Sequence, residues 1–248
     1  MGTYTQRLHR VIAHRGASAD APENTLSALK LAIEQGAGSV EVDAMISSDG
    51  VAYLHHDDKL ERCTNGKGYL CASNAFALDA LDASGSKTEF TGEPLPRLSA
   101  AAELLINKGI GLNLEIKPTP GLEVETAIAV VDCLKPLWPY ELPLVLSSFS
   151  KDALYAAKTA WPEAPRALIT CAVPANWKEV LSALQCTNFH MGAPLLSATA
   201  AQQIKSAGYG LYCYTVNEVA EANSLFAMGV DGVFTDKPEL LIGGNERG

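Results

Sequence analysis

The sequence predicts an α/β fold, a (β/α)8 TIM barrel with a small insertion after the second strand. Short apolar strands alternate with helical segments eight times along the 248 residues. Four predicted helices end in a glycine directly before the next strand, namely Gly36, Gly109, Gly208 and Gly229. Glycine is the usual residue where a helix ends and a loop leads into the next strand. Neither G-x-G-x-x-G nor G-x-x-x-x-G-K-[ST] is present, so an open nucleotide-binding sheet is disfavoured.

The strands are predicted from short apolar runs, and the helices from apolar residues that repeat every three or four positions. The strands start near residues 11, 40, 112, 144, 167, 188, 211 and 232. The helices cover about residues 24–36, 99–109, 124–131, 151–160, 177–184, 197–207 and 217–228. Pro22 precedes the first helix, and Asn24 is its predicted N-cap. Asp49-Gly50 predicts a hairpin turn, from which residues 51–54 return beside the second strand.

From about residue 59 to residue 96 neither the helical nor the strand period is visible, and glycine and proline recur. Unstructured loops of this length are unusual in a compact domain. We therefore interpret the stretch as an insertion between a strand and its helix, a position from which insertions often cover active sites. The sequence predicts a single domain, residues 1–248, with this insertion at about 59–96.

The composition excludes several classes of function. The net charge of −9 argues against a nucleic-acid surface, which needs a basic face. No run of about 18 apolar residues exists, so we expect no membrane span. The six cysteines form no C-x-x-C pair, and residues 1–10 contain no apolar leader segment. Reduced thiols in a cytoplasmic protein are the expectation. No long apolar stripe indicates an oligomeric state.

Two strands carry acidic residues in an otherwise apolar context. Glu41 and Asp43 are two residues apart, as are Glu115 and Lys117, so each pair shares one face of its strand. Like charges this close repel, and an unpaired buried carboxylate is costly. Three carboxylates with a lysine beside them indicate a hard-metal site next to an anion-binding group. A structural ion pair and a solvated strand end remain the alternative interpretations.

Polar residues recur at the carboxyl ends of the predicted strands, where barrel enzymes place their active sites. These residues are His14, Arg15, Glu41, Asp43, Glu115, Lys117, Ser148 and Asn217.

Seven motifs resemble those of the glycerophosphodiester phosphodiesterase family, and most closely its compact, cytoplasmic bacterial members. They are His14-Arg15-Gly16, Pro22-Glu23-Asn24-Thr25, Glu41-x-Asp43, His56-Asp57-Asp58-x-Leu60-x-Arg62, Glu115-Ile116-Lys117, Tyr214-Thr215-Val216-Asn217 and Asp231-Gly232-Val233-x-Thr235-Asp236-x-Pro238. Each motif alone is weak, whereas all seven in order over nearly the whole chain are very specific.

The resemblance implies a barrel enzyme that hydrolyses glycerophosphodiesters, such as glycerophosphocholine and glycerophosphoethanolamine, to glycerol 3-phosphate and an alcohol. This is a reaction of glycerol and lipid metabolism on a small-molecule substrate. It also implies a divalent cation, Mg²⁺ or Ca²⁺, held by Glu41, Asp43 and Glu115. Neither the choice between the two ions nor the preferred leaving alcohol is fixed by the motifs.

The resemblance further implies that His14 and His56 are the acid and base, and that Arg15 and Lys117 contact the phosphate. Two histidines suit paired proton transfer near neutral pH. In the family's proposed scheme, the glycerol 2-hydroxyl attacks phosphorus first, and water then opens the resulting cyclic phosphate.

Several neighbouring residues are given other interpretations. His55 is expected to be structural, and His190 is expected to be a satisfied core or rim histidine. Phe149 and Tyr214 are candidate contacts for the glycerol or the leaving alcohol, although packing alone is the commoner role of such aromatics. Asp57, Asp58 and Arg62 are expected to anchor the loop that carries His56, and Glu23 to be structural, as is Asn24.

Three rival interpretations remain open. A Schiff-base lyase would use Lys117 as its nucleophile, but it leaves the two histidines without a role. A barrel that only binds phosphodiesters would not need every catalytic position to be filled. A lysophospholipase D-like activity on lipids is disfavoured by the lack of a basic amphipathic stretch.

Overall fold

The structure is a computed structural model that describes residues 7–245. The prediction that the N-terminal ten residues contain no leader segment falls mostly on residues 1–6, which lie outside the described part. The strands are β1 (Val11–His14), β2 (Ser39–Ile46), β3 (Ala52–Leu54), β4 (Gly111–Ile116), β5 (Leu144–Ser148), β6 (Arg166–Thr170), β7 (Asn188–Gly192), β8 (Gly210–Tyr214) and β9 (Gly232–Thr235).

The helices surround these strands. They are α1 (Leu26–Glu34), α2 (Ala75–Leu78), α3 (Leu98–Lys108), α4 (Glu123–Leu134), α5 (Lys151–Ala160), α6 (Trp177–Ala183), α7 (Ala198–Ser206), α8 (Val219–Ala227) and α9 (Pro238–Asn245). Three short 3₁₀ turns are η1 (Leu70–Ala72), η2 (Thr88–Phe90) and η3 (Ala193–Leu195). None of the helices between residues 7 and 245 has the length and apolar character that crossing a bilayer requires.

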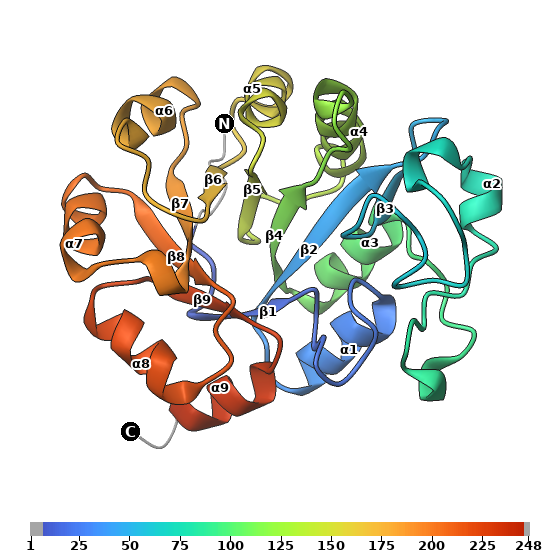
Figure 1. Cartoon of the computed structure of the whole chain (residues 1–248), viewed down its shortest axis with the longest axis horizontal. Coiled ribbons are helices and arrows are strands. Elements are labelled where there is room, and N and C mark those ends of the chain that lie inside the picture. Colours follow the sequence, from blue (N-terminus) through green and yellow to red (C-terminus); the bar gives the residue numbers. More distant parts are fainter. Residues whose placement is uncertain (1–6, 246–248) are drawn as a thin grey trace.

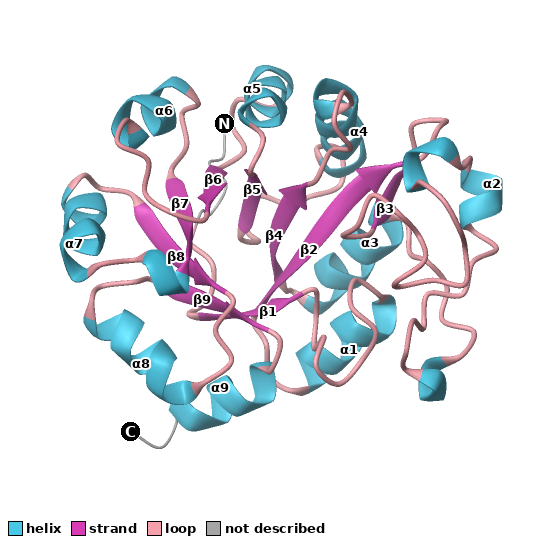
Figure 2. Ribbon diagram, in the orientation of Figure 1, coloured by secondary structure: helices cyan, strands magenta, loops and turns pink. Residues whose placement is uncertain are grey.

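Eight parallel strands form a closed barrel with the helices outside it, which confirms the predicted (β/α)8 fold (Figure 1). The strand order runs β1-β9-β8-β7-β6-β5-β4-β2, and pairing of β1 with β2 closes the ring. β3 pairs antiparallel with β2 at the outer edge, as the Asp49-Gly50 turn predicts. Figure 2 shows helices following the strands around the barrel. α9 is the eighth of these outer helices and was not predicted.

Strand alternation separates two cores. On β2, Val40 and Val42 pack outward against the helices, whereas Glu41 and Asp43 belong to the inward face. The barrel interior beneath the site is filled by a separate apolar cluster. Its buried members are Leu8, Ile12, Val145, Ala167, Tyr212 and Phe234. The inward-facing polar residues therefore lie above a packed apolar layer that fills the barrel interior.

Residues 59–96 contain short helical turns and an apolar cluster of their own, which includes Leu60, Leu70 and Leu78. This segment lies between β3 and α3 at one side of the barrel (Figure 1). Several side-chain contacts tie it to the first βα unit. Ser27 Oγ donates a hydrogen bond to Glu93 Oε2 at 2.6 Å, and Lys87 donates to the carbonyl of Ala19.

The predicted helix over 124–131 exists as α4, and the structure shows which of its residues face the barrel. Val124 is 52% exposed and Ile128 is 37% exposed, whereas Ala127 and Val130 are fully buried. Ala127 and Val130 belong to the apolar core between the helices and the barrel. Apolar residues on this helix therefore occur on its exposed face as well as on its buried one.

A buried cation joins the amino-terminal end of the barrel to two helix ends. Arg166, at the start of β6, is only 3% exposed, and burial lowers its pKa. Among the described residues, its guanidinium donates only to backbone carbonyls, at 2.6–3.3 Å, from the ends of α5 and α6 and the loops that follow. The acceptors are Leu184, Trp161, Pro162, Ala164 and Gln185. Carbonyls at helix carboxyl ends favour a positive charge.

Replacing Arg166 with Met should lower the free energy of unfolding by about 2–4 kcal/mol, because buried carbonyls lose their donors. Urea denaturation followed by circular dichroism measures the effect. Lys158→Met is the matched control, since Lys158 donates to the Ala183 carbonyl at the protein surface. We expect it to cost less than about 1 kcal/mol. Equal losses of unfolding free energy in the two variants would show that the buried Arg166 hydrogen bonds stabilise the fold no more than the one that Lys158 makes at the protein surface.

Candidate active site

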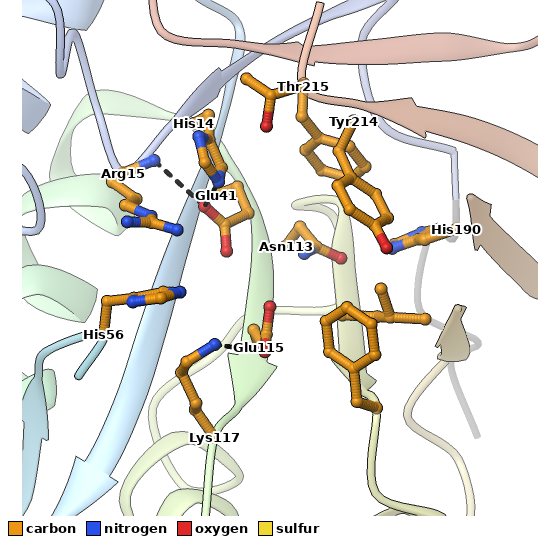
Figure 3. Close-up of a pocket in the computed structure, with 13 residues that line it drawn as sticks. His14, Arg15, Glu41, His56, Asn113, Glu115, Lys117, His190, Tyr214 and Thr215 are labelled. Atoms are coloured by element: carbon orange, nitrogen blue, oxygen red, sulfur yellow. Dashed lines mark hydrogen bonds and ion pairs between the residues drawn. The ribbon is translucent and has the colours of Figure 1, made fainter. Parts of the chain in front are cut away.

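A cavity of about 240 Å³ opens at the carboxyl ends of the barrel strands (Figure 3). Eight of the nine residues predicted as site residues line it, and the ninth, Asp43, lies beside two of them. The lining residues are His14, Arg15, Glu41, His56, Asn113, Glu115, Lys117, Phe149, Ile169, His190, Tyr214, Thr215 and Phe234. The fold thus brings together residues that are more than 200 positions apart in the sequence.

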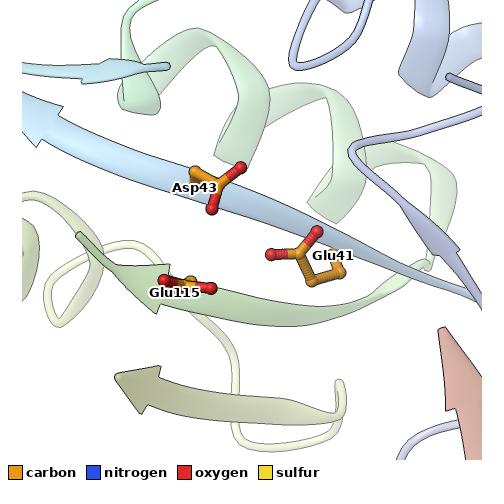
Figure 4. Close-up of side chains that lie close together, drawn as sticks. All are labelled: Glu41, Asp43 and Glu115. Carbon is orange, nitrogen blue, oxygen red and sulfur yellow. The ribbon is translucent and has the colours of Figure 1, made fainter. Parts of the chain in front are cut away.

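Three acids converge from two neighbouring strands (Figure 4). The parallel register of β2 and β4 pairs Asp43 with Glu115 and Glu41 with Asn113. One ligand oxygen from each of the three acids lies within 4.8 Å of the others. None of the three residues is more than 9% exposed. The spacing of two residues along each strand is sufficient to place all three on the inward face.

The electrostatics of this acid cluster call for a cation. Burial raises the pKa of Glu41 well above its usual range, and the nearby charges of Asp43 and Glu115 raise it further. Burial and the charge of Asp43 also raise the pKa of Glu115. Three oxygen ligands with open positions between them suit a hard divalent ion better than a soft one. The cluster therefore fits a divalent metal.

Two residues of the β1–α1 loop hold the acids in place. Asn24 Nδ2 donates to Asp43 Oδ2 at 2.9 Å, and Asn24 Oδ1 accepts from the Asp43 backbone N–H at 3.0 Å. The backbone N–H of Arg15 donates to Glu41 Oε2 at 3.0 Å. Arg15 and Asn24 both have φ of 57°, a left-handed conformation that is uncommon outside glycine. The strained loop thus positions two of the three acids.

The sequence-based assignment of Asn24 as the N-cap of α1 is wrong. Thr25 caps the helix, because its side chain accepts from the Ala28 N–H at 3.1 Å. Thr and Asn are both good N-caps, so the motif alone did not distinguish them. The shift by one residue frees the Asn24 amide to bind Asp43.

Two cations border the acid cluster. Arg15 Nε lies 3.1 Å from Asp43 Oδ2, although without the geometry of a hydrogen bond. Lys117 Nζ donates to Glu115 Oε1 at 3.2 Å and lies 3.8 Å from Asp43 Oδ1. Three carboxylates and these two cations leave one negative charge in excess. A bound divalent ion would turn the sum to one positive charge, which is a suitable balance for a singly charged anion.

Each of the two predicted catalytic histidines is oriented by its own carboxylate. His14 Nδ1 lies 2.7 Å from Asp236 Oδ1, and His56 Nδ1 lies 2.6 Å from Asp57 Oδ1. An ionised carboxylate only accepts hydrogen bonds, so Nδ1 of each ring carries the proton. Nε2 of each ring is then the free nitrogen. That of His14 lies 3.9 Å from Glu41 Oε2.

Both supporting carboxylates are kept ionised. Burial alone would raise the pKa of Asp236, but hydrogen bonds from His14 and Asn217 outweigh it and hold the pKa at about 2. Asn217 Nδ2 donates to Asp236 Oδ2 at 2.8 Å. The hydrogen bond from Arg62 holds the pKa of Asp57 far below its usual range. The sequence alone predicted no role for Asp236. The available signal was its position in a late motif, just after the last strand.

A chain of ion pairs connects Arg15 to His56. Glu23 accepts from Arg15 Nη1 at 2.8 Å and from Arg62 Nη1 at 2.6 Å. Arg62 Nε then donates to Asp57 Oδ2 at 2.6 Å. Burial would raise the pKa of Glu23, yet its bonds to Arg62 and Arg15 hold it at about 2. This network connects the loop after β3 to the loop after β1.

His55 and His190 differ in their hydrogen bonding. His55 is buried, and its Nε2 lies 3.1 Å from the Lys59 carbonyl, which fits a structural role. His190 on β7 is buried in the cavity lining, but its Nε2 has no hydrogen-bond partner among the described residues. The expectation of a satisfied histidine at position 190 is therefore wrong. Burial lowers the pKa of His190 to about 3, so the ring is neutral.

Aromatic rings form the wall opposite His14 and His56 (Figure 3). Phe149 and Tyr214 meet edge to face, with ring centroids 6.1 Å apart. The Tyr214 hydroxyl donates to the Thr170 carbonyl at 3.0 Å, which fixes the ring. Phe149 is 47% exposed and stands at the mouth.

Comparisons with known proteins agree on one family. Residues 14–240 match the model of the glycerophosphoryl diester phosphodiesterase family. The chain is 32% identical over 239 residues to a glycerophosphodiester phosphodiesterase from Caldanaerobacter subterraneus subsp. tengcongensis, covering 94% of this chain and 96% of that protein.

Solved structures give the same result. The structure of a phosphodiesterase from Oleispira antarctica, in complex with its product sn-glycerol-3-phosphate, is 42% identical and superposes with a TM-score of 0.93 over 96% of this chain and 97% of that one. A glycerophosphodiester phosphodiesterase from Agrobacterium tumefaciens is 26% identical, with a TM-score of 0.78 over 95% and 100% of the two chains. The chain therefore belongs to the glycerophosphoryl diester phosphodiesterase family, and is a phosphoric diester hydrolase.

Proposed function

We propose that this enzyme hydrolyses glycerophosphodiesters such as glycerophosphocholine and glycerophosphoethanolamine to sn-glycerol 3-phosphate and an alcohol. The observation that carries the proposal is the pairing of two carboxylate-supported histidines beside one acid cluster. The Oleispira antarctica relative, whose structure contains sn-glycerol-3-phosphate, supports the same product.

We propose that Glu41, Asp43 and Glu115 hold the divalent cation, Mg²⁺ or Ca²⁺. When bound there, the ion supplies Lewis-acid stabilisation of the negative charge that develops on the phosphoryl oxygens. Arg15 and Lys117 contact the same phosphate from the rim of the cluster. Arg15 offers a fork of donors, and Lys117 offers a mobile point charge.

The base and acid roles of the two histidines are assigned from the cavities that each of them lines. His14 lies within the inner cavity, whereas His56 also lines a second, wider cavity that extends outward past Asp58 and Phe149. The glycerol group fits the inner cavity, and the leaving alcohol departs through the outer one. His14 is therefore the base for the glycerol 2-hydroxyl, and His56 is the acid for the leaving oxygen.

In the first step, Nε2 of His14 takes the proton of the 2-hydroxyl, and that oxygen bonds to phosphorus. The bond from phosphorus to the leaving oxygen breaks, and His56, which enters this step as the imidazolium, gives that oxygen its Nε2 proton. In the second step the roles reverse. Water loses a proton to His56 and attacks the cyclic phosphate. The 2-oxygen then leaves with the proton held by His14, and sn-glycerol 3-phosphate results.

We also propose a single cytoplasmic domain, in which residues 59–96 support the active site. Arg62, within this segment, contacts both Asp57 and Glu23, and so braces the loop that carries His56. The lyase interpretation gains no support, because the two histidine–carboxylate pairs would have no task in it.

Removal of the metal should abolish turnover of glycerophosphocholine. The assay measures sn-glycerol 3-phosphate release with EDTA, and then with Mg²⁺ or Ca²⁺ added back. We expect a loss of at least about a hundredfold and recovery with one ion, because the acids alone repel the anionic substrate. Glu115→Gln should weaken recovery, while Glu103→Gln on the outer face of α3 should not. Full activity after exhaustive chelation would contradict the metal assignment.

A substrate without the 2-hydroxyl should be turned over poorly. We compare glycerophosphocholine with 3-hydroxypropyl phosphocholine, which keeps the terminal hydroxyl. The analogue should react at least about a hundredfold more slowly, because it lacks the internal nucleophile and its effective concentration. A transient cyclic phosphate in ³¹P spectra would support the scheme directly. Equal rates for the two substrates would exclude the cyclic route and leave direct attack by water.

Asp236→Asn should lower kcat by roughly a hundredfold or more with little change in KM. The new amide nitrogen must face a donor from either His14 or Asn217, so the His14 tautomer is no longer fixed. Asp20→Asn is the control, since Asp20 is exposed and bonds only to Gln35 among the described side chains. A kcat within threefold of wild type would show that Asp236 does not orient the base.

A further inference from the structure

Three buried polar atoms of the residues that line the inner cavity have no hydrogen-bond partner among residues 7–245. One is Arg15 Nε, which lies 3.1 Å from the carboxylate of Asp43. The other two are Oδ1 of Asn113, on β4, and Nε2 of His190, on β7. Each of these two residues is only 1% exposed, and each lines the cavity. Buried polar side chains in folded proteins are nearly always hydrogen-bonded, and an unpaired one is costly. Two unpaired atoms in the same cavity indicate a ligand that supplies the missing hydrogen bonds.

Both side chains are fixed in place. The Asn113 amide nitrogen donates to Ser147 Oγ at 2.9 Å, so its carbonyl oxygen is the group left over. The His190 ring is held against Tyr212 and Phe234, with centroid distances of 5.4 and 5.0 Å. In Figure 3 the Asn113 oxygen is directed to the same side as His190. Rigid, unpaired groups of this kind are typical of a binding site formed in advance.

The chemistry of the missing partner follows from the atoms that face it. Asn113 Oδ1 accepts only, and so requires a donor. The neutral His190 ring offers one donor and one acceptor nitrogen. A hydroxyl group both donates and accepts, and therefore satisfies either residue without adding charge. Ile169 and Phe234 line the same region with apolar surface, which suits the carbons next to such a hydroxyl.

The substrate of the proposed function carries two hydroxyls, and they have different places. The 2-hydroxyl must lie beside phosphorus and His14 to react. His190 and Asn113 lie on the far side of Glu41 from Arg15 and His56 (Figure 3). The hydroxyl that extends away from the phosphate is the terminal one, on carbon 1 of the glycerol group.

We propose that Asn113 and His190 bind the terminal hydroxyl of the glycerol group and so make this enzyme selective for glycerol over smaller diols. The inference rests on the proposed function and assigns two specificity-determining residues to it. Neither residue exchanges a proton with the reacting atoms. Their effect is on binding and alignment of the glycerol group.

The test uses a pair of substrates on the whole enzyme with its metal. Glycerophosphocholine is compared with 2-hydroxypropyl phosphocholine, which keeps the attacking hydroxyl and lacks only the terminal one. Wild type should prefer the full substrate by tenfold or more in kcat/KM. His190→Leu should lose about tenfold on the full substrate and threefold or less on the analogue, so that discrimination collapses. Asn113→Ala should behave in the same way.

Asn223→Ala is the matched control, because Asn223 is exposed on the outer helix α8, away from the cavity, and this variant should keep the wild-type preference. Equal losses on both substrates in both polar variants would overturn the proposal and leave the residues a structural role. So would a wild-type enzyme that turns over the two substrates equally well, since a buried water would then satisfy both atoms. Failure of wild type to hydrolyse either substrate would instead overturn the proposed function, and the inference with it.

A second readout needs no variant that might misfold. Inhibition of wild type by sn-glycerol 3-phosphate is compared with inhibition by 2-hydroxypropyl phosphate. The full product should bind about tenfold more tightly if the terminal hydroxyl is recognised. Equal inhibition constants would contradict the proposal even if every variant proved unstable.

Discussion

The burial of three carboxylates at one point is the constraint on which the rest of the site depends. Glu41, Asp43 and Glu115 would repel one another in a medium of low polarity, and burial raises the pKa of both glutamates. The surrounding chain supplies positive charges and hydrogen-bond donors to these acids, and the cost is a strained backbone in the loop that carries them. Arg15 and Asn24 adopt left-handed backbone conformations in order to reach the acids. Such local strain persists only where surrounding contacts over-determine it.

Much of the fold and of the acid cluster could be predicted from the sequence because both follow from local periodicity. Alternation along a strand is fixed by backbone geometry, so Glu41 and Asp43 had to share a face wherever that strand lay. The eight-fold repeat of strand and helix then selected a closed barrel, with strand ends as the site. The motif resemblance supplied the two catalytic histidines as a prediction, since nothing local distinguishes His56 from its neighbour His55.

The sequence could not predict contacts that depend on tertiary geometry. The bond from His14 to Asp236 spans 222 positions, and no period connects them. Asn24 had an adequate local explanation as a helix cap, which concealed its long-range bond to Asp43. The unpaired state of His190 depends on the rings of Tyr212 and Phe234 around it. In each case the residue type was visible, but its partner was set by packing.

Closure of the barrel and assembly of the proposed base are the same structural event. β9 pairs with β1 from Val11↔Val233 to Ala13↔Thr235, one residue short of His14 and Asp236. The register of the β1–β9 pairing therefore decides whether the Asp236 carboxylate reaches Nδ1 of His14. Asn217, which follows β8, then holds Asp236 from its other side. An opening of the β1–β9 pairing would therefore separate His14 from its carboxylate. The most distant pairing in the chain is thus also the one on which the orientation of His14 depends.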